Sequence, residues 1–148
     1  MAQSTTTKPD LVAITRDYFR LVDTRSPDLL SLFTDDFDFY YPKYGRGKGA
    51  EQLMEVVAGL GQRVRSVEHD PSTYLFLPSG NHVVVEGTTR GVLTSGATWA
   101  AGETPSGRFC NIFEFRGSKI QRLAVYLDPD YLNEARGAFL WGQEGRTW

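Results

Sequence analysis

The sequence predicts a single α+β domain whose helices, from the first part of the chain, pack on a sheet from the second part. Before residue 62, apolar residues recur at spacings of three and four, which is typical of amphipathic helices. After Gly61 the pattern changes to runs rich in valine, threonine and phenylalanine, which favour strands. Helices followed by strands indicate an α+β arrangement with the helices on one face of a bent sheet.

Three segments before residue 62 are expected to be helical, because each has an apolar stripe and a recognisable start or end. Asp10 suits the first turn of the first helix, and Ser26 followed by Pro27 is a favourable start for the second. Glycines at the end of the third helix would stop it. A short strand over 37–40 and a glycine-rich loop over 45–49 separate the last two. The expected helices are residues 11–22, the segment from Ser26 to Phe33, and residues 50–60.

The second half is expected to form the sheet. Residues 64–69 and 72–77 are interpreted as one strand interrupted at Asp70-Pro71, because proline cannot donate to a strand ladder. Residues 95–107 are expected to be a loop, and Asp128-Pro129 would cap a short final helix. The remaining expected strands are residues 82–94, 108–116 and 119–128. The domain is expected over residues 9–140, with a disordered tail at 1–8 and a loosely ordered tail at 141–148.

Composition and charge exclude several classes of function. The net charge of −2 argues against a nucleic-acid partner, which usually needs a basic patch. No apolar run is long enough to span a membrane. Cys110 is the only cysteine, and His69 and His82 lack metal-ligand spacing, so neither a disulfide nor a metal is expected. A lone cysteine fits a cytoplasmic protein, and no sequence motif predicts a cofactor.

Three stretches resemble a known superfamily: "SPDLLSLFTDDF", "YYPKYGRGKGAEQL" and "FEFRGSKIQRLAVYLD". In this order they look like the nuclear transport factor 2-like fold and, within it, the SnoaL-like branch of polyketide cyclases and ketosteroid isomerase-related proteins. The resemblance covers roughly residues 10–135. It implies a cone, in which a strongly curved sheet wraps around helices and encloses an apolar pocket.

The resemblance implies that Asp128 is a catalytic acid–base, since the polyketide cyclase branch carries its aspartate at the end of the last strand. The alternative is that Asp128 caps the final helix. Strand alternation leaves two orientations open: either Tyr126 and Asp128 face the pocket, or Leu123, Val125 and Leu127 do. In the first case Tyr126 would contact the substrate.

Three further residues match positions of the ketosteroid isomerase branch. Tyr18 on the first helix matches an oxyanion-binding tyrosine, and Asn111 falls about where a second hydrogen-bond donor lies. Tyr41 stands where that branch carries its general-base aspartate, and a tyrosine is a poor base at neutral pH. Tyr41 would instead donate a hydrogen bond to a substrate oxygen, or serve only in packing.

The remaining candidates rest on residue type and place in the chain. His69 could be a general acid or base, because an unperturbed imidazole titrates near neutrality and a bulge can turn it toward a site. Trp99 in the loop 95–107 could form part of a pocket lid. Arg108 could orient a substrate carboxylate or pair with Asp128.

The leading hypothesis is a homodimer, formed through the sheet, that binds a small hydrophobic, oxygen-bearing molecule. If it is an enzyme, the resemblance implies a cyclase, isomerase or dehydratase that needs no cofactor. Two alternatives are a non-catalytic ligand-binding module and a dimeric interaction module with a closed cone. Epoxide hydrolysis would need two aspartates and an arginine around a water, of which Asp128 and Arg90 supply a part.

Overall fold

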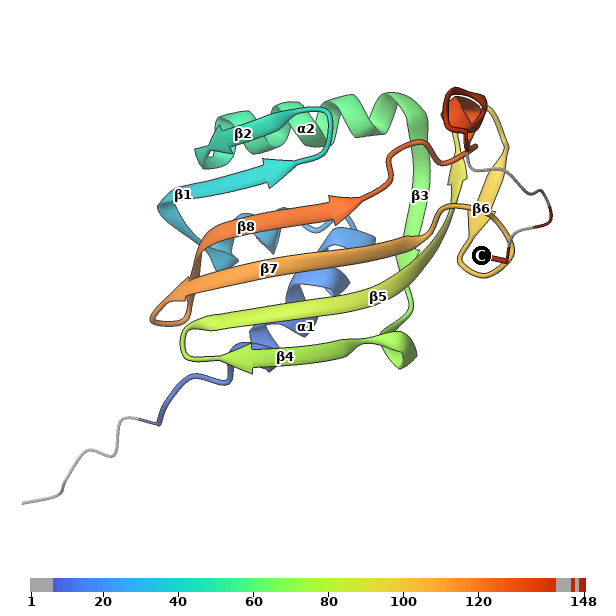
Figure 1. Ribbon diagram of the computed structural model, residues 1–148. Coiled ribbons are helices and arrows are strands. Elements are labelled where there is room, and N and C mark those ends of the chain that lie inside the picture. The colour runs from blue at the N-terminus through green and yellow to red at the C-terminus, as the bar shows by residue number, and fades with distance from the viewer. Residues whose placement is uncertain (1–6, 141–144, 146) are drawn as a thin grey trace, which may run out of the picture.

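The computed structural model describes residues 7–140, 145, 147 and 148. The expected tails at 1–8 and 141–148 therefore lie largely outside the described residues. Figure 1 shows the two α-helices on the concave side of a curved sheet. This arrangement confirms the predicted α+β class, with N-terminal helices packed on a mixed, strongly curved sheet.

The first helix, α1, spans Leu11–Asp23 and begins where the Asp10 side chain accepts the Ala13 N–H at 3.0 Å. The segment that follows is a 3₁₀-helix, Pro27–Leu32, begun by Ser26 as predicted. The prediction that this helix includes Phe33 is wrong. Phe33 already belongs to strand β1, Phe33–Tyr41, because its ring turns into the core and is 5% exposed.

The glycine-rich stretch expected as a loop contains strand β2, Gly45–Lys48, which pairs antiparallel with β1. Gly47 lets the two strands approach, since a Cβ there would lie 2.3 Å from the Phe39 ring. Helix α2 covers Gly49–Arg63 and runs through Gly59 and Gly61, which were expected to end it. Both glycines have open space around them, so their cost is the helix propensity alone.

The described residues form an eight-stranded sheet in the order β2-β1-β8-β7-β5-β3, with β4 and β6 also paired to β5. Strand β1 runs parallel to β8, and the other paired strands are antiparallel. The remaining strands are β3, Val64–His69; β4, Leu75–Ser79; β5, His82–Leu93; β6, Thr98–Ala100; β7, Arg108–Arg116; and β8, Lys119–Leu127.

The predicted interruption at Asp70-Pro71 is confirmed. Strands β3 and β4 pair with successive parts of β5, and the 3₁₀-helix Pro71–Thr73 lies between them. The prediction of a loop over 95–107 is wrong in part, because β6 pairs with β5 there. The final helix is a 3₁₀-helix, Glu134–Ala138, and its free N–H groups are bound by Asp130 rather than by Asp128.

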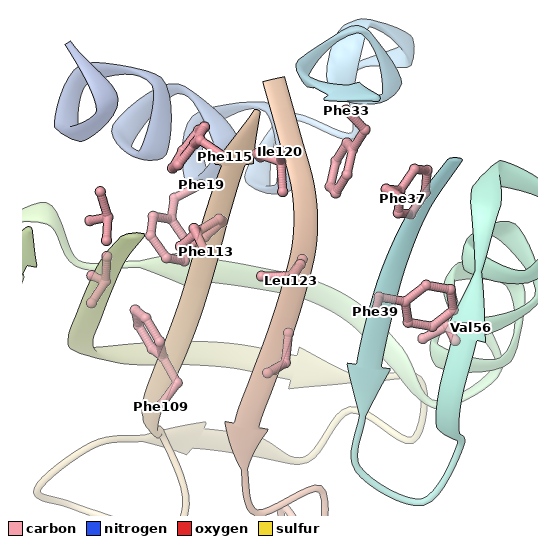
Figure 2. Packing of buried hydrophobic residues seen from close by; sticks show 13 residues of the cluster. Phe19, Phe33, Phe37, Phe39, Val56, Phe109, Phe113, Phe115, Ile120 and Leu123 are labelled. Atoms are coloured by element: carbon pink, nitrogen blue, oxygen red, sulfur yellow. The ribbon is translucent and has the colours of Figure 1, made fainter. Parts of the chain in front are cut away.

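The main core is an aromatic-rich cluster between the helices and the concave face of the sheet. In Figure 2, Phe19 projects from α1 toward Phe113, and Phe39 projects from β1 toward Val56 of α2. The apolar stripe expected on this helix included Met54 and Val57, which are 48% and 43% exposed, so that expectation is wrong in part. The buried residue of α2 is Val56, which lies outside the expected stripe.

Candidate functional site

Strand β7 places one amide among the aromatic residues of the concave face. Phe109, Asn111 and Phe113 alternate with outward residues, and all three are buried. Asn111 is 3% exposed, and its Oδ1 atom has no hydrogen-bond partner among the described residues. Buried polar atoms are nearly always paired, so an unpaired carbonyl oxygen here indicates a missing partner.

Two of the predicted tyrosines share this concave side. The Tyr18 ring packs edge-to-face on Phe113, with centroids 5.0 Å apart, and Phe113 is two residues from Asn111 on the same face of β7. Tyr41 ends β1, next to β8. Burial raises the pKa of both phenols, and Asp23 adds to the rise for Tyr18. Both hydroxyls therefore keep their protons and can donate hydrogen bonds.

A third tyrosine, Tyr131, was missed by the sequence argument. Its phenol hydrogen-bonds to Tyr41, and burial raises its pKa, with a smaller contribution from the Asp128 charge. Its ring also lies 4.3 Å from that of Trp99, centroid to centroid. Nothing in the local sequence marks Tyr131, because it follows the last strand in an irregular segment.

The orientation of β8, left open by the sequence, is settled by burial. Leu123 and Val125 are buried against the core, whereas Tyr126 is 50% exposed on the outer face and lies beside Tyr40. Asp128 follows β8 and is exposed. Its carboxylate accepts the N–H of Asp130 at 2.9 Å, so it stabilises a turn, while Asp130 binds the final helix.

His69 forms a dyad with Asp23, a residue that the sequence argument missed. The Nδ1 atom of His69 lies 2.6 Å from one carboxylate oxygen, and the His69 backbone N–H donates to the other at 2.8 Å. The ring also packs on Phe19 and Phe109, with centroids 4.8 and 5.0 Å away. Asp23 is the last residue of α1, where a negative charge interacts unfavourably with the helix dipole. That unfavourable placement is the sequence feature that could have identified Asp23 as a candidate residue.

Trp99 touches the candidate tyrosines only through Tyr131, and the structure does not bring Arg108 to the concave polar residues. Trp99 is 1% exposed in a second, smaller cluster, and its indole N–H donates to Thr89 Oγ1 at 3.1 Å. Arg108 is exposed and makes no ion pair with Asp128. It borders a surface pocket of about 610 Å³ that also contacts Cys110 and Tyr126.

No group of three or more metal-binding side chains occurs in the part of the chain that the structure describes. Within the same residues, no helix is both long and apolar enough to cross a membrane. Arg90, considered for epoxide hydrolysis, donates from two nitrogens to Glu68 Oε2, at 2.9 and 2.7 Å. Those two side chains are 72% and 62% exposed, so this pair lies at the surface.

Comparison with known proteins establishes the family. Residues 15–123 match the SnoaL-like domain, and the chain therefore belongs to the SnoaL-like domain family. No curated protein matches the chain. Solved structures confirm the nuclear transport factor 2-like fold: a protein of unknown function from Burkholderia pseudomallei has a TM-score of 0.70 at 16% identity, over 81% of this chain and 92% of its own.

Of two further similar structures, one contains a ligand and the other is described by an activity. TerC, co-crystallized with polyporic acid, has a TM-score of 0.67 at 19% identity, over 80% of this chain and 91% of its own. A candidate polyketide cyclase from Pseudomonas putida has a TM-score of 0.66 at 14% identity, over 82% of this chain and 93% of its own. At these identities the likeness concerns the fold.

Proposed function

We propose that this protein binds a small, largely apolar molecule with an oxygen substituent on the concave side of its sheet. Asn111 is the observation that carries the proposal. Its buried Oδ1 atom has no partner among the described residues, and leaving such an atom unpaired costs about 1–3 kcal/mol. A hydroxyl group of a bound molecule would supply the missing hydrogen bond.

The surroundings of Asn111 suit such a ligand. The neighbours on its face of β7 are Phe109 and Phe113, which would contact an apolar skeleton. Tyr18 and Tyr41 remain protonated and can donate to a carbonyl or enolate oxygen, which binds more strongly where water is excluded. TerC, with its bound polyporic acid, and the candidate polyketide cyclase support a ligand of this type by analogy of fold.

If the protein is catalytic, the reaction that fits is an acid–base step of the cyclase, isomerase or dehydratase type, without a cofactor. His69 is the better-supported base, because Asp23 accepts one hydrogen bond from its ring Nδ1 and another from its backbone N–H. Asp128 is exposed and engaged in a turn, which makes it the second choice. A non-catalytic binding module remains the alternative, since Tyr41 replaces the acid of the isomerase branch.

A thermal-shift screen against polycyclic ketones, lactones, epoxides and aromatic acids tests the proposal. A ligand of the native state raises the melting temperature by mass action. We expect hits on the native protein that are lost in Asn111→Leu and weakened in Tyr41→Phe, and kept in the matched surface variant Asp38→Asn. Hits that persist in Asn111→Leu would contradict the proposed site. Turnover of a hit, lost in His69→Gln, would separate an enzyme from a binding module.

We also propose that the outer face of the sheet pairs with a second copy of the chain. An apolar row crosses five strands in register there: Leu77, Val84, Ile112, Ala124 and Tyr40. No described helix covers this row, and Leu77 is 55% exposed. Light scattering should give twice the chain mass for the native protein and a monomer for Ile112→Arg. The control Met54→Arg, on α2, should stay dimeric.

The compartment proposed for this activity is the cytoplasm. The support is the single cysteine, Cys110, which is free and cannot form an internal disulfide.

A further inference from the structure

A groove borders α1 on the side away from the concave polar residues. It lies between α1 and the segment 69–74, has a volume of about 270 Å³, and is lined in part by Arg16, His69, Pro71 and Tyr74. Helix α1 crosses the part of the sheet formed by β3, β4 and β5 (Figure 1). None of Tyr18, Tyr41 and Asn111 lines this groove, so it is distinct from the surroundings of those three side chains.

One cation at the groove has no ion-pair partner among the described residues. Arg20 is paired with Asp17 at 3.1 Å, and both oxygens of Asp23 are engaged by His69. Arg16 forms no ion pair with any described carboxylate. Its guanidinium lies 4.4 Å from the centroid of the Phe76 ring, which fixes its position by a cation–π contact. Arg16 is therefore the cation that is free to bind an anion at this groove.

The dyad supplies a hydrogen-bond acceptor at the same groove. A carboxylate only accepts hydrogen bonds at neutral pH, so Nδ1 of His69 is the donor in the short contact to Asp23. The Nε2 atom has no partner among the described residues, and in a neutral ring with its proton on Nδ1 it carries a lone pair. This nitrogen can accept a hydrogen bond from a ligand hydroxyl.

Tyr74 adds a donor and an apolar wall. Burial raises the pKa of its phenol, and the Asp23 charge adds to the rise, so the hydroxyl keeps its proton. The Tyr74 and Pro71 rings would contact the body of a ligand. A volume of about 270 Å³ is below the usual ~300–1,000 Å³ of drug-sized sites, which limits the ligand to one ring.

We propose that this groove binds a one-ring hydroxy acid, with its carboxylate on Arg16 and its hydroxyl donating to Nε2 of His69. The inference goes beyond the proposed function, because it concerns a different, charged class of ligand. His69 is the one residue that also appears in the proposed function, as the base of the catalytic alternative. Binding at the concave face rests on Asn111 and binding at this groove rests on Arg16, so each can fail alone.

The test is a titration with 4-hydroxybenzoate followed by proton NMR of the histidine rings. The chain has two histidines, so His82 on the outer face is an internal control. We expect saturable shifts of the His69 resonances with those of His82 unchanged. The neutral analogue 4-hydroxybenzamide, and benzoate without the hydroxyl, should bind about tenfold more weakly, since each loses a hydrogen bond worth about 1.5 kcal/mol.

The matched variants are Arg16→Gln and Arg116→Gln. Both arginines are exposed, but Arg116 pairs with Asp36 far from the groove. Arg16→Gln should weaken 4-hydroxybenzoate at least tenfold, leave 4-hydroxybenzamide unchanged and keep the native spectrum, while Arg116→Gln should change nothing. Equal affinity in Arg16→Gln, or no His69 shift at about 10 mM, would overturn the proposal. Loss of binding in Asn111→Leu would assign the ligand to the concave site and overturn it as well.

Discussion

The two hydrophobic clusters of this protein differ in whether their buried polar groups are hydrogen-bonded. The small cluster consists of Val64, Leu93 and Trp99, and it holds together the end of the sheet where β6 lies. Its buried indole N–H is paired with Thr89 at 3.1 Å. The large cluster lies between the helices and the concave face and includes Phe113. There the amide of Asn111 keeps an unpaired oxygen among the described residues.

This difference in hydrogen bonding is the reason for proposing a ligand at the large cluster and none at the small one. Paired polar groups stabilise the native fold by themselves, so the small cluster acts as a scaffold. An unpaired buried oxygen lowers the stability of the protein without ligand, and in the proposed function a bound molecule completes its hydrogen bonding. Polar side chains near Trp99 and near Asn111 should therefore respond in opposite ways to removal.

The largest effect is expected at Gly91, where a Cβ would lie 2.1 Å from the Trp99 ring and 2.4 Å from the Ser66 carbonyl oxygen. Gly91→Ala should lower the free energy of unfolding by about 1–3 kcal/mol or more, because the backbone atom cannot move aside. The control Gly59→Ala, in α2 with open space around it, should instead raise it by about 0.5–1 kcal/mol. Urea unfolding measures both, and equal effects would show that the small cluster is loosely packed.

The next effect concerns the hydrogen bond of Trp99. Thr89→Val keeps the shape of the side chain but leaves the buried indole N–H without its partner. We expect a loss of about 1–3 kcal/mol in the free energy of unfolding, again measured in urea. Thr98→Val is the control, since Thr98 is exposed in the same region. An unchanged stability of Thr89→Val would remove the contrast between the clusters.

Asn111→Leu tests the other side of the comparison. The substitution removes an unpaired buried oxygen at similar volume, so the ligand-free protein should be unchanged within about 1 kcal/mol, or more stable. The readout is the melting temperature of the purified protein without ligand. A loss of several kcal/mol would mean that the amide is paired in solution and that the concave face needs no ligand.

The smallest effect is expected outside both clusters, at Glu114 on the outer face. The hydrogen bond from Arg122, at 2.8 Å, lowers the pKa of this carboxyl below its usual 4.5. A lowered folded-state pKa gives stability that is present above 4.5 and is lost as the pH falls through the lower value. Glu114→Gln should therefore flatten the fall in stability between neutral pH and about pH 3, compared with Glu51→Gln. Identical pH profiles of the two variants would contradict this assignment.

The order of helices and strands could be predicted from the sequence, because local periodicity reflects which face of an element is buried. Alternation in β7 also put Asn111 on the same face as Phe109 and Phe113, as the structure confirms. The short strands β2 and β6 were not predicted, because neither has a strong strand pattern of its own. Strand β2 is held by pairing with β1, and β6 is held by pairing with β5.

Which residues come into contact could not be predicted from the sequence. The sequence could not show which face of β8 packs against the core, because Ala124 and Val125 lie on opposite faces of the strand and both are buried. The dyad joins Asp23 and His69 across 46 positions of the chain, and the contact of Tyr41 with Tyr131 is still more remote in sequence. Such contacts depend on how α1, β1 and β3 pack in space. Local pattern carries no information about that packing, so a single sequence names candidate residues without assembling their site.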